Sequence, residues 1–441
     1  MPSRKPPFVW LLEKEWRELL ASRSWWVLLA VMGPLVGVSF ISAVRTYAEL
    51  SGYGGSAEGV GEAFSPLVGI WAPTFSACEL AAAFLLPFVA IRIFAGDQQS
   101  GALKLELQQP MPAWRRAGAK VIVLGAGWLI ASIPALLAVV LWRSYGGSIY
   151  PPELAAVVGG HLLNAGLTVA IASAAASLTD HPSTAAIVTL SVTVGTWIVN
   201  FIAAVQGGIW ERIAGYTPTA IVAEFQHGLV RLDVVLIALT LMALGLAVAA
   251  IWMRLGAPVR TRVHESVLFA AGAAALVFAF SAMSPSWDLS ENRMNSLPAG
   301  DEAVLRTIRK PLRIEAHLAA EDPRRADLER KVLIKLRRIV PRVEVRYVAA
   351  TTTGLFEQSS AHYGEVWYRV DDSVPVMSRK TTVDGVLGAI YEAAGLPSPG
   401  ESSDIFTGHP LAVPPRRAGT VFYGIWPALV AAGVLLRRRQ A

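Results

Sequence analysis

The stretch Arg92–Lys120 reads RIFAGDQQSGALKLELQQPMPAWRRAGAK and separates two long apolar runs of the chain. Its charged and amide side chains exclude most of it from hydrocarbon, where polar groups without partners cost several kcal/mol each. We therefore expect a polar segment, residues 95–119, to lie in water between two membrane-spanning helices. Every other part of the chain is placed relative to this segment.

The composition is that of a membrane protein. Hydrophobic residues make up 54% of the chain and charged residues 16%, with a mean hydropathy of +0.46. Soluble domains have about 45–50% apolar and about 25% charged residues. The single cysteine, Cys78, excludes an internal disulfide framework. The net charge of +6 comes without interleaved basic and aromatic residues, so nucleic acid is not expected as a partner.

The predicted fold is a polytopic α-helical membrane protein with about eight transmembrane helices. Phe8–Leu20 has helical spacing of apolar residues and predicts a helix on the inner membrane surface; a simple extension of the first span is the alternative. The remaining apolar runs suffice to cross ~30 Å of hydrocarbon. They are Trp25–Ala43, Phe75–Ala95, Val121–Trp142, Leu154–Leu178, Thr184–Ala204, Val234–Trp252, Val267–Met283 and Val421–Leu436. Residues just before Phe75 are expected to be re-entrant or interfacial.

The distribution of arginine predicts the orientation. Arg17 and Arg23 precede the first span, and Arg437-Arg438-Arg439 follow the last. Because basic residues gather on the cytoplasmic side, both termini are expected to be cytoplasmic. The protein is then a multi-pass protein of the cell inner membrane, and residues 284–418 are extracytoplasmic.

This outer region has the pattern of a small α/β domain between the last two spans. Leu312–Leu318 and Val343–Val348 alternate as strands around a basic amphipathic helix, Ala326–Ile339, which predicts parallel pairing. The later elements complete the domain. They are a strand pair, Glu365–Val370 and Val374–Met377, and a helix, Thr382–Ala394.

The polar segment resembles the cytoplasmic coupling segment of ABC-2 type transporter permeases. That family carries an acidic pair, Gly-Thr, a leucine-rich helix, a proline and Gly-Lys; here the acidic pair is Gly96-Asp97 and Gly-Thr is Gly101-Ala102. The resemblance implies contact with a separate ATPase subunit. The residues that it assigns to ATPase coupling are Asp97, Gly101, Leu105, Glu106, Pro110, Trp114 and Lys120.

Two further motifs resemble the gliding-motility branch of the same family. Phe225, Gly228 and Asp233 precede the sixth span, as in the permease of that branch. The second motif resembles the start of the auxiliary component of those transporters, although Asn295 replaces the usual aromatic and the domain is shorter. Its residues are Asp288, Leu289, Arg293, Ser296 and Leu297.

The resemblance implies a permease fused to a truncated auxiliary domain. The expected parts are an interfacial helix (1–23), a six-span permease (24–255), a linker with the seventh span (256–283), the extracytoplasmic domain (284–418) and the eighth span with a basic C-terminus (419–441).

The function expected from this resemblance is that of an exporter's permease subunit. The chain has no phosphate-cradling G-x-x-x-x-G-K-[ST] loop, so it is not expected to be an enzyme. ATP is expected only through the partner ATPase, with no cofactor or metal bound directly. Expected partners also include a second copy of the permease, the lipid bilayer and an envelope or substrate partner for the outer domain. The alternative is a mechanical or signalling coupler of the cell envelope that transports nothing.

Glu79 is the one carboxylate within the second apolar run and is a possible intramembrane polar site. It lies about one turn inside the outer boundary, where it can also reach water. The other polar candidates in the spans are small: His161, Asn164 and Asn200. A lipid-like substrate, or none, is therefore expected rather than a small ion.

Overall fold

The computed structural model describes the chain in two compact units. The described residues are 6–52, 64–100, 111–206, 209–254, 256–319, 322–348, 362–399 and 406–440. Unit 1 comprises Met1–Asn292 and Thr407–Ala441, and unit 2 comprises Arg293–Phe406. Unit 2 is narrower than the predicted outer domain, because both flanks of residues 284–418 belong to unit 1.

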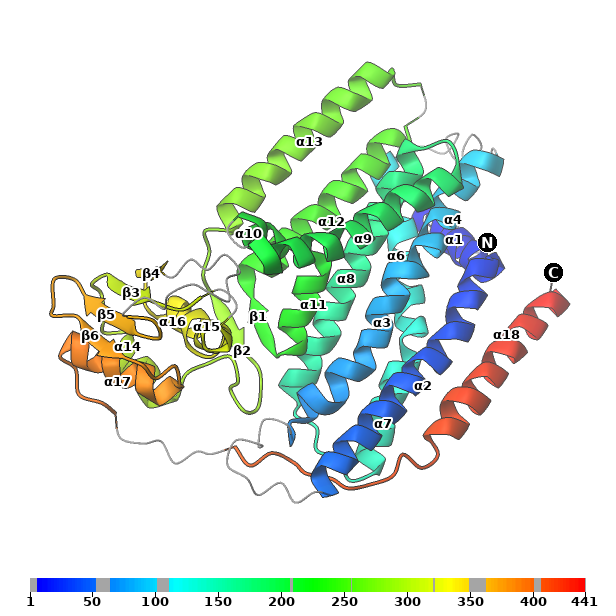
Figure 1. The fold of residues 1–441 in the computed structure, drawn as a ribbon. Coiled ribbons are helices and arrows are strands. Elements are labelled where there is room, and N and C mark those ends of the chain that lie inside the picture. Colours follow the sequence, from blue (N-terminus) through cyan, green and yellow to red (C-terminus); the bar gives the residue numbers. More distant parts are fainter. Residues whose placement is uncertain are drawn as a thin grey trace, which may run out of the picture. The chain divides into compact units, whose positions relative to one another are not determined.

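Unit 1 is a helical bundle (Figure 1). Its helices are α1 (Pro7–Ala21), α2 (Arg23–Gly52), the π-helix η2 (Leu67–Trp71), α3 (Ala72–Phe84), α4 (Leu86–Ser100), α6 (Ala113–Ala131), α7 (Ile133–Ser144), α8 (Pro151–Leu178), α9 (Pro182–Gln206), α10 (Ile209–Ala214), α11 (Pro218–Gln226), α12 (Leu232–Trp252), α13 (Val259–Phe280), the π-helix η4 (Thr420–Ile425) and α18 (Trp426–Gln440). A two-stranded sheet joins β1 (Leu229–Arg231) to β2 (Ser286–Asp288).

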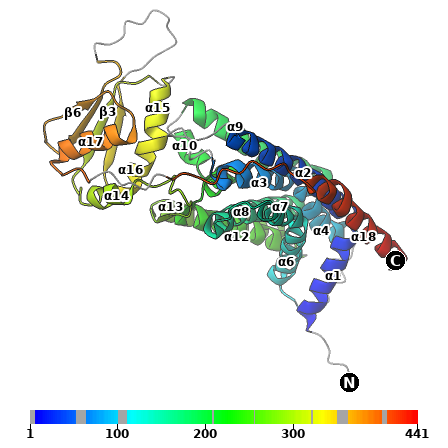
Figure 2. The same cartoon turned by 90° about the horizontal axis from the view of Figure 1, so that it is seen from below.

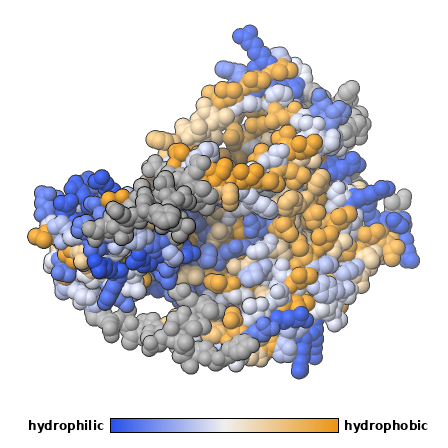
Figure 3. Space-filling view, in the orientation of Figure 1, coloured by the Kyte–Doolittle hydropathy of each residue, from blue (hydrophilic) through white to orange (hydrophobic). Residues whose placement is uncertain are grey.

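Among the described residues, eight helical stretches are long and apolar enough to cross a membrane, as the sequence predicts. Apolar side chains cover much of the visible surface of these helices (Figure 3). The stretches exceed the predicted runs, since Arg23–Gly52 and Ala113–Ser144 include polar ends. The residues just before Phe75 were expected to be re-entrant or interfacial, but from Leu67 onward they form one helical stretch with the second candidate span.

Proline interrupts two of these stretches. Helix α3 gives way to α4 at Leu85, two residues before Pro87, and α6 gives way to α7 at Ser132, two residues before Pro134. Proline cannot donate its backbone nitrogen to the preceding turn and clashes with the carbonyl four residues earlier. The helices therefore break at these points without leaving the bundle.

Unit 2 is a two-layer α/β domain (Figure 2). Its elements are α14 (Ala299–Leu305), β3 (Leu312–Ala316), α15 (Pro323–Leu328), the π-helix η3 (Glu329–Leu333), α16 (Ile334–Ile339), β4 (Val343–Tyr347), β5 (Val366–Val370), β6 (Val376–Ser378) and α17 (Val383–Ala394). The sheet order is β4-β3-β5-β6, and β3 pairs with β4 in parallel, as predicted.

Strand alternation places the core of unit 2 on one face of its sheet. Leu312, Ile314 and Ala316 of β3 are fully buried with Ile390 of α17 and Leu336 of α16. The alternate residues of β3 and β5 point away from this core. All helices of this unit that enter the core thus cover the same face.

Candidate functional site

A buried ion cluster joins three helices of unit 1. The ammonium of Lys120 in α6 donates to both carboxylate oxygens of Glu15 in α1, at 2.9 and 2.8 Å. It also donates to Asp97 Oδ2 near the end of α4, and to the carbonyl of Ile93 at 3.0 Å. Lys120 and Glu15 are 0% exposed and Asp97 is 2% exposed. A lysine buried so completely needs these acceptors, since an unpaired buried charge has a large desolvation cost.

A second lysine completes the cluster at its solvent side. Lys14 Nζ lies 2.7 Å from Asp97 Oδ1, 3.1 Å from Glu18 Oε1 and 3.3 Å from Glu15 Oε1. Its side chain is 30% exposed, so water screens these pairs more than those of Lys120. Three carboxylates therefore share two ammonium groups.

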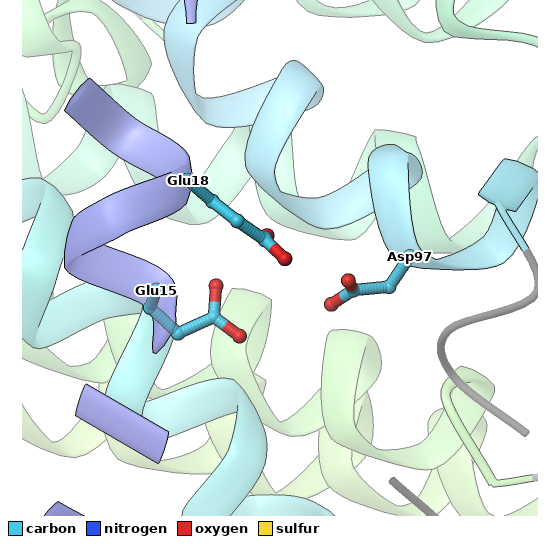
Figure 4. A group of neighbouring side chains, drawn as sticks. All are labelled: Glu15, Glu18 and Asp97. Carbon is cyan, nitrogen blue, oxygen red and sulfur yellow. The ribbon is translucent and has the colours of Figure 1, made fainter. Parts of the chain in front are cut away.

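The three carboxylates could be mistaken for a metal site. Figure 4 shows Glu15, Glu18 and Asp97 turned toward one another, and their oxygens lie within 4.8 Å of each other. The oxygens of Glu15 and Asp97 already accept from the two lysines, which supply the positive charge that a cation would bring. The donor set fits an ion cluster.

Burial raises the pKa of the Glu15 carboxyl, while Lys120 and Lys14 oppose that rise. The lysines thus keep a carboxylate in a place where its desolvated charge would otherwise be unfavourable. Sequence reasoning missed Glu15. The signal was its position between Leu11 and Leu19, four residues from each, on the face of α1 that is buried.

The cluster brings together the two ends of the predicted coupling segment. Asp97 and Lys120 were both predicted to act in ATPase coupling, and the structure joins them directly. Trp114 is 62% exposed, with the guanidinium of Arg115 at 5.2 Å from its ring. The other predicted coupling residues lie outside the described residues. They are Gly101, Leu105, Glu106 and Pro110.

The opposite end of the bundle brings together the two other predicted motifs. Gly228 has φ of +74°, which favours glycine, and its carbonyl accepts from Leu289 N at 2.8 Å. A side chain at Gly228 would come within 3.0 Å of Ser290 N. Phe225 is buried in an apolar cluster against which Leu289 packs.

Asp233 and Asp288 hold the ends of these strands. The guanidinium of Arg231 bridges Asp233 Oδ1 at 3.2 Å and Glu224 Oε1 at 2.8 Å. Asp288 Oδ1 accepts from the backbone nitrogen of Ser290 at 3.1 Å. The predicted motif Phe225, Gly228 and Asp233 therefore flanks β1, and the other predicted motif begins at Asp288, the last residue of its partner strand β2.

The rest of the auxiliary motif lies in unit 2. Leu297 is 1% exposed in the core of that unit. Ser296 N donates to Arg293 O at 2.8 Å, and Arg293 lies 3.8 Å from Glu302. These residues organise the start of the domain, and the motif is divided between the two units after Asn292.

Sequence reasoning also missed Glu153 at the start of α8. Glu153 is 0% exposed, and its Oε1 accepts from the backbone nitrogen of Glu291 at 2.6 Å. The Glu291 carboxylate lies 3.0 Å from His409, whose carbonyl accepts from the hydroxyl of Tyr47 at 2.7 Å. No sequence motif links these distant positions. The contacts of Glu291 and His409 hold the chain segments before and after unit 2 against the helical bundle.

The polar residues predicted within the candidate spans do not form one site. Glu79 in α3 is half-buried and makes no hydrogen bond or ion pair within the described part of the chain. His161 is buried against the ring of Phe75, 5.5 Å away, and lies 3.3 Å from Gln226. Asn200 accepts from Thr217 at 3.0 Å. Asn164 is buried in α8.

No protein-family model, curated protein or solved structure matches this chain.

Proposed function

We propose that this chain is the membrane-spanning permease subunit of an ATP-driven ABC-2 type exporter, working with a separate ATPase subunit. The observation that supports this best is the buried ion cluster of Glu15, Asp97 and Lys120. The sequence resemblance assigns the ATPase contact to the segment between Asp97 and Lys120. The cluster joins the two ends of that segment, which is what a coupling segment requires.

Because its two ends are held together, the coupling segment would transmit its motion to the helices that it connects. Removing one partner of a buried ion pair costs about 3–5 kcal/mol, far above thermal energy, so the cluster resists opening. Displacement of the segment by an ATPase would then move the ends of α4 and α6 together with α1. Helices α4 and α6 belong to the second and third candidate spans, so the displacement would enter the membrane domain.

Co-purification tests the partner. A C-terminal tag and mild detergent should recover an ABC ATPase near one-to-one with this chain, identified by mass spectrometry. The variant Leu105→Ala/Glu106→Ala/Pro110→Ala should lose the ATPase. The matched control is Asp180→Ala/His181→Ala/Ser183→Ala, in the turn before α9 and the first turn of α9, which should retain it. Wild-type protein without an ATPase, or a coupling variant that keeps it, would contradict the proposal.

A second measurement separates binding from transmission. The variant Glu15→Gln/Asp97→Asn/Lys120→Met removes the buried charges of the cluster together. It should keep the ATPase bound, because Leu105, Glu106 and Pro110 are unchanged, and should lose the permease-dependent stimulation of ATP hydrolysis. Loss of binding and of stimulation together would place the cluster in the contact itself. Unchanged stimulation would remove the cluster from the coupling path.

The pairing of β1 with β2 favours a second candidate function, a mechanical coupler without a transported substrate. Motion of α12 would pass through β1 to β2, which leads by sequence into unit 2. ATP-dependent changes in amide exchange of β2 would agree with both functions. Transfer of a molecule across reconstituted vesicles would then decide for the exporter, and its absence for the coupler.

The remaining partners follow from the exporter proposal. A second copy of the permease would complete the transporter, and unit 2 would face an envelope or substrate partner outside the cytoplasm. The mass of the purified complex measures the copy number directly.

A further inference from the structure

A pocket lies on the face of the unit 2 sheet that is opposite to its core. Its volume is about 220 Å³. Arg313 and Glu315 line it from β3, and Trp367 and Arg369 line it from β5. These residues alternate with the buried residues of the same strands, so they point away from the core. The pocket is therefore built on side chains of the two central strands of the sheet.

Two arginines stand side by side in this pocket. Arg313 and Arg369 are directly opposite each other in the antiparallel register of β3 and β5, where like charges destabilise a sheet. Arg313 Nε lies 3.3 Å from Glu344 Oε2 on β4, on the side of β3 away from β5. The guanidinium of Arg369 makes no hydrogen bond or ion pair within the described residues. An anion between the two guanidinium groups would relieve their repulsion.

Aromatic rings form another part of the pocket. The ring of His362 lies 6.3 Å from that of Trp367, at an angle of 78°, and 5.9 Å from the ring of His317. All three residues line the pocket. Nδ1 of His362 lies 3.0 Å from Glu365 Oε2, and its Nε2 makes no bond in the described part of the chain. A ligand thus meets an indole ring beside the arginines and a histidine nitrogen that has no partner there.

These groups define the chemistry of a ligand. Guanidinium groups bind carboxylates through two parallel hydrogen bonds. The carboxylate of Glu315 accepts hydrogen bonds when ionised, so it needs a donor such as a hydroxyl. The negative face of an indole attracts the C–H groups of a saturated ring. A carboxylate, several hydroxyls and one apolar ring face occur together in a uronic acid.

The position of the pocket argues against a peptide. Strands β3 and β5 each pair with a neighbour on both sides, whereas an extended peptide adds to an unpaired edge of a sheet. Inorganic phosphate would meet the arginines, but it would bring its charge near Glu315 and leave the rings unused. The pocket is also smaller than the ~300–1,000 Å³ of ordinary ligand sites, so it accommodates one residue of a larger ligand.

We propose that this pocket binds one uronic acid residue of an acidic saccharide, with the carboxylate between Arg313 and Arg369 and the sugar ring on Trp367. Glu315 and His362 bind its hydroxyls. The proposal depends neither on an ATPase nor on a transported substrate, because every residue that it uses belongs to unit 2.

Isothermal titration calorimetry of the full-length protein in mild detergent tests the proposal, with trimers of galacturonate and of glucuronate as ligands. We expect saturable binding of at least one trimer to wild type. Its methyl ester keeps the rings and loses the charge, so it should bind at least about tenfold more weakly. Arg369→Gln and Trp367→Leu should each weaken binding of the acid about tenfold.

The matched control is Arg346→Gln. Arg346 is exposed on β4 opposite Glu315, on the same face of the sheet but outside the pocket lining. This variant removes the same charge as Arg369→Gln and should bind the acid as wild type does. Equal losses for the two variants would overturn the proposal, because the net charge of the face would then explain the binding.

Other outcomes also overturn the proposal. No binding of either trimer to wild type excludes the site, and equal binding of the acid and its methyl ester excludes recognition of the carboxylate. Equally tight binding of hexaglutamate or of inorganic phosphate would assign the arginines to an acidic peptide or to phosphate. Arg313→Gln removes the other guanidinium and should repeat the effect if Arg369→Gln fails to fold.

Discussion

Lys120 supplies the buried positive charge that holds the ion cluster together. Glu15 and Asp97 lie within hydrogen-bond distance of it, and water reaches none of the three to any extent. Lys14 also touches both carboxylates, but from a position that is 30% exposed. The two lysines therefore differ in burial while they share the same acceptors.

Lys120→Met should destabilise unit 1 by roughly 3–5 kcal/mol, because it leaves two buried carboxylates without their main counter-charge. Lys14→Met should cost about 0–1 kcal/mol, as exposed pairs do. Thermal and denaturant unfolding of both variants in the same detergent measures the difference. Similar losses for both variants would show that burial does not govern these pairs.

A variant without any buried charge in the cluster separates the effect of charge on stability from the effect of side-chain packing. The variant Glu15→Gln/Asp97→Asn/Lys120→Met removes the buried charges together, so it should be more stable than Lys120→Met alone. A triple variant as unstable as the single one would mean that the lysine acts through its shape and not through its charge.

Asp322 belongs to unit 2, and its contribution to the stability of this unit depends on pH. Bonds from the side chain and backbone nitrogen of Arg324, with one from Tyr363, hold the pKa of Asp322 down at about 2. A carboxyl with a lowered pKa stabilises the folded state above its unfolded pKa of about 3.9, and that stability is lost as the pH falls toward 2.

Asp322→Ala should therefore weaken helix α15 by about 1 kcal/mol at pH 7, since Asp322 caps it. Amide exchange of α15 peptides in the full chain, corrected for intrinsic rates, measures this change. The difference from wild type should shrink between pH 4 and pH 2. The control Asp327→Ala removes an exposed carboxylate from the same helix and should change little. A difference that stays constant with pH would contradict the role of the charge.

Residue identity was only partly predictable. Asp97 and Lys120 follow from a local pattern, because each adjoins an apolar run and both belong to one motif. Glu15 does not, since its partner is 105 residues away and a carboxylate in an amphipathic helix is usually exposed. Glu153 and His409 each contact Glu291, which is 138 and 118 residues away in the sequence. Such contacts depend on packing between spans, which no single stretch encodes.

At the scale of elements, η4 and α18 contact α2 at two glycines of α2. A side-chain atom at Gly33 would come within 2.1 Å of Trp426, and one at Gly37 within 2.6 Å of Phe422. Trp426 Nε1 donates to the carbonyl of Leu29 at 2.7 Å. In lipid, helices associate by such close approach, and pairs of small residues four apart permit it.

Gly37→Leu should force η4 away from α2 and cost about 1–3 kcal/mol by overpacking against Phe422. The measurement is the midpoint of thermal unfolding in detergent. Gly195→Leu in α9 is the matched control, because an added atom there meets nothing within 4 Å. Equal midpoints for the two variants would mean that η4 moves away from α2 without loss of stability.

The existence of the elements was more predictable than their ends. Hydropathy alone predicted the eight helices that are candidate spans, and alternation predicted β3 and its parallel partner β4. The additional turns of α2 beyond Ala43 are polar, so no hydropathy pattern reveals them. The division of the chain after Asn292 was not predictable from local pattern either, because it depends on the pairing of Ser286–Asp288 with β1, a strand more than 50 residues earlier in the sequence.

At the scale of the molecule, the number of spans decides the side on which each segment lies. If all eight candidate helices cross the membrane, the chain ends on the side where it begins, and unit 2 lies on the other side. The arginines at 437–439 favour the cytoplasm for both termini. The turn between α8 and α9 must then be cytoplasmic as well.

Cysteine labelling of intact cells tests this arrangement. In a Cys78→Ser background, Ser398→Cys in unit 2 should react with a membrane-impermeant maleimide added outside, since Ser398 is exposed. Ser183→Cys, exposed at the start of α9, should react only after the cells are permeabilised. One span fewer before Ser398 would exchange the side of unit 2 relative to the N-terminus. Labelling of Ser183→Cys in intact cells would therefore contradict the arrangement, because either the number of spans before Ser183 or the cytoplasmic position of the N-terminus would be wrong.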